Sequence, residues 1–103
     1  MKPQMPNLRI GSIVLTSRVL AAPMAGVSDR PYRRIARSYG AALAVSEMVS
    51  SNSSLRHTRL SQRRVDHHDE PGPISVQLLG ADPGEMADAA RFNVDRGADI
   101  IDI

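Results

Sequence analysis

The residues of this chain best suited to chemistry follow or end short apolar runs. They lie in residues 23–26, 46–48 and 77–80, and glycines in two of these segments allow backbone to approach a planar ligand. Gln77 offers an amide, with donors and an acceptor, within the apolar run of residues 74–79. A buried unpaired amide costs several kcal/mol. Gln77 is therefore expected either to bind a ligand or to bond a neighbouring strand or loop.

Alternating strands and helices must position these segments. Residues 8–20 have the punctuation of a β-hairpin, and the strands are predicted at residues 19–22, 41–45, 74–79 and 99–103. Helices are predicted at residues 28–40 and from Asp82 to Gly97, with Met86, Ala89, Ala90 and Val94 on the inner face of the second. The polar residues 50–72 predict a short helix at most, followed by a loop. This order indicates a parallel α/β sheet, whose ligands bind at the carboxyl ends of the strands.

The first predicted helix has two stripes at helical spacing. Its apolar stripe is predicted to be buried, and the basic stripe lies about 200° away around the helix. The apolar residues are Tyr32, Ile35, Ala36 and Tyr39, and the basic ones are Arg30, Arg33, Arg34 and Arg37. The basic stripe is either a solvated surface or a contact for a polyanion.

The charge of the 103-residue chain is divided unevenly along its length. Residues 1–65 carry 11 basic and two acidic side chains, whereas residues 66–103 carry two basic and nine acidic ones. The positive half suggests a polyanionic or phosphate-bearing partner, although a solvated face has the same pattern. With no cysteine, no thiol chemistry resides in these residues.

Other features of the sequence favour a soluble cytoplasmic protein. Residues 19–27 form the longest apolar stretch, which is too short for a membrane span, and residues 1–6 do not resemble a signal peptide. The segment His67-His68-Asp69-Glu70 is expected to be a surface loop rather than a metal site. We therefore expect no membrane partner and no metal.

Several motifs occur in one order along residues 8–103, and together they resemble the tRNA-dihydrouridine synthases, most closely the bacterial B subfamily. The most specific motif is Ala-Pro-Met-Ala-Gly-Val-Ser-Asp-Arg-Pro-Tyr-Arg at residues 22–33. Ser-Glu-Met-Val-Ser at residues 46–50 and Pro-Ile-Ser-Val-Gln-Leu-Leu-Gly at residues 73–80 resemble the ends of the second and third barrel strands. Residues 82–103 are similar to the run into the fourth strand.

The resemblance implies an FMN-dependent (β/α)₈ TIM barrel that reduces uridine to 5,6-dihydrouridine in tRNA, with NADPH as reductant. Carried over by position, the residues expected to contact FMN are Pro23, Met24, Ala25 and Gln77. The general acid of the family is a cysteine in an Asn-x-Gly-Cys-Pro motif that would follow Ile103, so no catalytic residue is assigned within this chain.

A complete barrel needs roughly 250 residues, so we expect an incomplete one. Residues 1–7 are predicted to be a lead-in, and residues 8–103 to be the hairpin and first four strands of a truncated FMN-binding TIM-barrel catalytic domain. Such a fragment is expected to be inactive alone. Two other functions stay open: another FMN-dependent barrel of the dihydroorotate dehydrogenase type, or a non-catalytic basic module that binds RNA.

Overall fold

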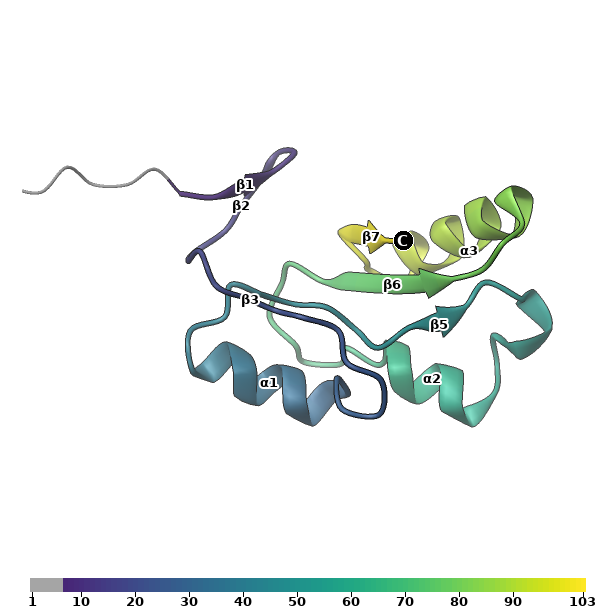
Figure 1. Ribbon diagram of the computed structural model, residues 1–103, viewed down its shortest axis with the longest axis horizontal. Helices are drawn as coiled ribbons and strands as arrows, with labels where there is room; N and C mark the ends of the chain where they lie inside the picture. Colours follow the sequence, from purple (N-terminus) through teal and green to yellow (C-terminus); the bar gives the residue numbers. More distant parts are fainter. Residues whose placement is uncertain (1–6) are drawn as a thin grey trace, which may run out of the picture.

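The computed structural model describes residues 7–103, so residues 1–6 of the predicted lead-in lie outside the described residues. The elements, in chain order, are β1 (Arg9–Ile10), β2 (Ile13–Val14), β3 (Leu20–Ala21), α1 (Arg30–Ser38), β4 (Leu43–Ala44), β5 (Val49–Ser50), the 3₁₀ turn η1 (Ser53–Leu55), α2 (Arg59–Val65), β6 (Ser75–Leu79), α3 (Pro83–Asp95) and β7 (Ile100–Asp102). β1 and β2 form the predicted antiparallel hairpin, which stands apart from the other strands (Figure 1).

The remaining strands run parallel in the order of the chain. β3 pairs with β4, and β5 pairs with β6, which pairs with β7. Between β4 and β5, a bridge from Val45 to Ser75 continues the ladder, so residues 43–50 act as one interrupted strand between β3 and β6. This arrangement confirms the parallel α/β class. Closure of these strands into a barrel stays a prediction.

The apolar core lies between β6 and α3. Val76 and Leu78, on one face of β6, are buried in a cluster with Val49, Ala89 and Ala98. α3 begins as predicted, because Asp82 Oδ2 accepts from Glu85 N at 2.8 Å with Pro83 at the first helical position. Val94 was expected on the inner face but is exposed. Because α3 packs on this face of β6, Gln77 points to the opposite face, away from α3.

The predicted burial of the two stripes on α1 is wrong at several positions. Tyr39 is 89% and Ile35 58% exposed, whereas Arg33 is 2% exposed. The cause is Glu70, which was expected in a surface loop but has a side chain only 1% exposed. Its carboxylate oxygens lie 2.9 Å from Arg33 Nε and 3.3 Å from Arg37 Nη2. A buried partner more than 30 positions along the chain draws two arginines inward, and helical periodicity alone does not reveal it.

The polar segment between β5 and β6 contains more helix than expected. η1 and α2 occupy it, and both helices at the bottom of the view, α1 and α2, lie beneath the strands (Figure 1). Asn52 Oδ1 accepts from Ser54 N at 3.0 Å and begins η1, so this serine-rich stretch supplies a helix cap. No helix among residues 7–103 has both the length and the apolar character that a membrane crossing requires.

Candidate functional site

A row of hydrogen bonds joins the carboxyl ends of the parallel strands. Gly26 N donates to Glu47 Oε1 at 2.7 Å, which ties the loop after β3 to the next strand. Gln77 N donates to Ser46 Oγ at 3.1 Å, and Gln77 Nε2 donates to Asp102 Oδ2 at 2.8 Å. These five residues, here called the strand-end row, link four neighbouring chain segments at the edge where parallel sheets bind ligands.

The loop after β3 carries three of the predicted cofactor residues and is held by Ser28. Met24 N donates to Ser28 Oγ at 2.7 Å, and Met24 O accepts from Val27 N at 3.0 Å. Ser28 itself is fully buried, while Met24 remains 40% exposed. Gly26 has a φ of 75°, and a Cβ built there would meet nothing within 4 Å. The loop therefore presents a fixed, open stretch of backbone and small apolar side chains.

Pro23 and Ala25 flank Met24 in this loop, and both retain access to solvent. Gln77, the fourth predicted cofactor residue, lies on β6. The strand formed by residues 43–50 separates β6 from β3 and the loop that follows it. Gln77 is half-buried on the face of β6 opposite Val76 and Leu78. Of the two possibilities left open for Gln77, a bond to a neighbouring strand is observed at its amide nitrogen. Its contact with a ligand stays a prediction.

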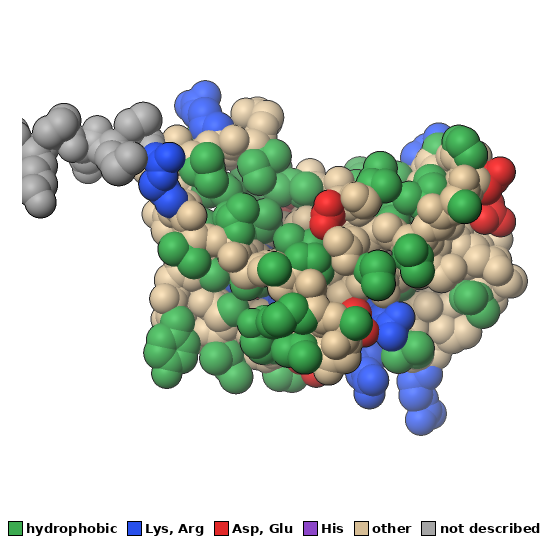
Figure 2. Space-filling view, in the orientation of Figure 1, with side chains coloured by type: hydrophobic (Ala, Val, Ile, Leu, Met, Phe, Trp, Pro, Cys, Tyr) green, Lys and Arg blue, Asp and Glu red, His purple; other side chains and the backbone are tan. Residues whose placement is uncertain are grey.

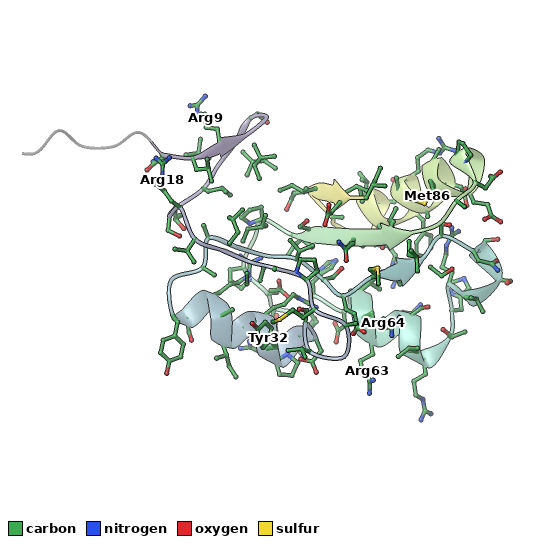
Figure 3. The ribbon with its side chains drawn as sticks, viewed as in Figure 1. Arg9, Arg18, Tyr32, Arg63, Arg64 and Met86 are labelled. Carbon is green, nitrogen blue, oxygen red and sulfur yellow. The ribbon has the colours of Figure 1, made fainter. Side chains whose placement is uncertain are left out.

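Glu47 was given no role from the sequence, yet its buried carboxylate connects two neighbouring elements in this region. Besides accepting from Gly26 N, its Oε1 lies 3.1 Å from Arg64 Nη2. Arg64 also donates to Met48 O at 3.1 Å and lies between α2 and the strands (Figure 3). The signal available in the sequence was a charged residue placed two positions after the apolar run of residues 41–45. The ion pair anchors the loop of Gly26 to α2.

Ser28 and Asp102 were also missed. Ser28 begins the helix predicted at residues 28–40, but Asp29 caps α1, because its Oδ1 accepts from Tyr32 N at 3.1 Å. Ser28 instead turns back and holds the preceding loop, donating to Ala22 O at 3.3 Å. Asp102 was seen only as part of a strand. Its alternation with Ile101, which packs on the core, could have placed it on the face of Gln77.

A second polar feature is a hollow of about 770 Å³ between α2, the segment after it and the end of α3. Basic side chains from both helices line it, among them Arg59, Arg63 and Arg96. Figure 3 shows Arg63 projecting from α2 away from the sheet. His67 and His68 also line the hollow. Among the described residues, no group of three or more His, Asp or Glu side chains is placed to hold a metal ion.

Comparisons with known proteins bear on this site. Residues 19–103 match the family model described as "Dihydrouridine synthase (Dus)". The chain is 53% identical over 96 residues to tRNA-dihydrouridine synthase B of Pasteurella multocida and 54% identical over 96 residues to that of Escherichia coli K12. These matches cover 93% of this chain but 29% and 30% of the relatives, so the chain spans about a third of their length. This chain belongs to the dihydrouridine synthase family.

Proposed function

We propose that this chain is the first third of a flavin-dependent tRNA-dihydrouridine synthase, which reduces uridine to 5,6-dihydrouridine in tRNA in the cytoplasm. The observation that carries the proposal is the strand-end row, which joins all four of the family-like segments at one edge of a parallel sheet. The names of the relatives support the reaction. By "full-length enzyme" we mean this chain together with the remaining length found in those relatives.

The residues at this edge fit one wall of an FMN site. Pro23, Met24 and Ala25 supply a compact apolar surface for a planar ring, and the open backbone at Gly26 leaves room beside it. Gln77 supplies the hydrogen-bonding group for the polar edge of that ring. Bound FMN supplies the reducing equivalents that NADPH delivers, and these residues orient it. The proton donor belongs to the cysteine motif of the family, outside these 103 residues.

Gln77→Ala is expected to weaken FMN binding by the full-length enzyme. A net contribution of about 0.5–1.5 kcal/mol for a hydrogen bond corresponds to a rise of about 2- to 13-fold in the FMN dissociation constant. Fluorescence titration of the apoprotein with FMN measures it. Gln62→Ala is the matched control, because Gln62 is also a half-buried glutamine but donates to Arg56 O, away from the strand-end row. Equal affinities for the two variants would remove Gln77 from the site.

The burial of two arginines on α1 argues against the polyanion contact that the sequence left open for its basic stripe. Arg33 and Arg37 are buried against Glu70, so they are not available to phosphates. We propose instead that the backbone of tRNA contacts the basic hollow, through Arg59, Arg63 and Arg96. Asp66 and Asp69 also line the hollow, but among the described residues none of these three arginines forms an ion pair, so we expect them to be the side chains that neutralise phosphates.

Neutralising these arginines is expected to reduce the salt dependence of tRNA binding. Removing one phosphate contact lowers the slope of log K against log salt by roughly 0.7–0.9. Arg59→Gln, Arg63→Gln and Arg96→Gln are combined in the full-length enzyme, and tRNA affinity is measured by filter binding over a salt series. Arg34→Gln with Arg91→Gln is the control, because both arginines are exposed but lie outside the hollow. An unaltered slope in the triple variant would show that the hollow is only a solvated surface.

A further inference from the structure

Gln77 and Asp102 form a matched pair across two parallel strands. They are register partners in the β6–β7 ladder, as are Val76 and Ile101 one position earlier. Val76 and Ile101 pack in the core beneath α3, so the alternation of side chains puts Gln77 and Asp102 together on the opposite face. There Gln77 Nε2 lies 2.8 Å from Asp102 Oδ2. The contact is thus set by the register of the sheet.

The chemistry of this pair fixes which way the amide points. An ionised carboxylate only accepts hydrogen bonds, so it must face the NH₂ group of Gln77. Turning the amide by 180° would place its carbonyl oxygen against a negative charge. The backbone of Gln77 is held as well, because its N–H donates to Ser46 Oγ at 3.1 Å. Gln77 therefore has one orientation, with its carbonyl oxygen directed away from Asp102.

We propose that Asp102 is a positioning residue that orients the Gln77 amide for the flavin ring. In the orientation that Asp102 selects, Gln77 presents its carbonyl oxygen and its second N–H side by side. That pair is complementary to a ring N–H next to a ring C=O, which is the polar edge of an isoalloxazine. The inference deepens the proposed function and rests on it, because it requires the strand-end row to hold FMN.

Two substitutions of Asp102 in the full-length enzyme test the orientation. Asp102→Ala removes the acceptor that fixes both the side-chain rotamer and the orientation of the Gln77 amide, so we expect the competent arrangement to fall to about a tenth of the population and the FMN dissociation constant to rise about 10-fold. Asp102→Asn can pair with either orientation of Gln77, so we expect a rise of only about 2-fold, for an amide that spends half its time reversed. The visible absorption bands of bound flavin should shift in both. Asp95→Ala, which removes an exposed carboxylate on α3, is the control and should leave both readouts unchanged.

A double variant separates amide orientation from simple packing. Gln77→Glu combined with Asp102→Asn restores a hydrogen-bonded pair with reversed polarity, but residue 77 then offers the ligand no donor. We expect its thermal midpoint to return close to that of the unmodified enzyme while FMN affinity stays low. Recovery of FMN affinity along with stability would contradict the proposal.

The outcomes distinguish this inference from the proposed function. Failure of the unmodified full-length enzyme to bind FMN would overturn the function and the inference with it. FMN bound equally tightly, with the same spectrum, by the unmodified enzyme and Asp102→Ala would overturn the inference alone.

Discussion

Replacing Glu70 with alanine is expected to destabilise the full-length enzyme by about 3–5 kcal/mol, because removing one partner of a buried ion pair leaves the other charge uncompensated. Two guanidinium groups would lose their carboxylate, since Glu70 binds both Arg33 and Arg37 and its side chain is 1% exposed. The arginines also donate to backbone oxygens of the loop before α1 and of the segment before β6, at Ser28 and Pro73. Urea unfolding measures the free energy of unfolding.

The same change should reach the candidate site. Arg33 Nη1 donates to Ser28 O at 2.9 Å, and Ser28 Oγ holds Met24 N. Loss of Glu70 therefore loosens the loop that we propose for FMN. Asp88→Ala is the control, because it removes the Arg56–Asp88 pair, whose carboxylate is 57% exposed. Such exposed pairs contribute about 0–1 kcal/mol. A Glu70→Ala variant as stable as Asp88→Ala would show that the ion pairs of Glu70 with Arg33 and Arg37 do not hold α1 in place.

Residues 1–103 expressed alone are expected neither to unfold cooperatively nor to form dihydrouridine. Within residues 7–103, β3 and β7 each pair on one side only, so both sheet edges expose unpaired backbone groups, which favour aggregation. Apolar side chains are exposed on or next to the strands: Leu20 on β3 by 44%, Leu79 at the end of β6 by 55% and Ile103 after β7 by 87%. In the space-filling view, hydrophobic side chains are spread over the visible face, above the strands and also above α1 (Figure 2).

Thermal unfolding, FMN titration and mass spectrometry of digested tRNA check this expectation on the isolated chain. The chemical part is independent of the folding part, because the chain contains no cysteine to act as the general acid of the family. A monomer with one sharp unfolding transition would contradict the folding part. Dihydrouridine formed by this chain alone would contradict the chemical part.

Local signals predicted the parallel strands and the start of α3 well. Continuous apolar runs are typical of parallel strands, and they marked the strand positions even at β3, where Leu20 is 44% exposed. The Asp82–Pro83 start depends on neighbouring residues alone. The side chains that turn inward from α1 could not be found in this way. Their burial depends on Glu70, which is distant in the chain and lies in a segment whose composition predicts a surface loop.

For the candidate site, the strand ends were predicted from the sequence but the contacts between them were not. The apolar runs located the strand ends, and the family resemblance selected Pro23, Met24, Ala25 and Gln77. The residues that connect them, Glu47 and Asp102, carry charges whose partners are fixed only by strand register and by the packing of α2. Register between parallel strands joined by long crossovers is not encoded in any local pattern.

The proposed function is tested most directly on the full-length enzyme, incubated with FMN, NADPH and tRNA that lacks dihydrouridine. Mass spectrometry of the digested tRNA measures the conversion of uridine. We expect dihydrouridine that requires NADPH, formed by a protein that retains FMN through gel filtration. A folded full-length protein that retains no flavin and leaves the tRNA unmodified would contradict it.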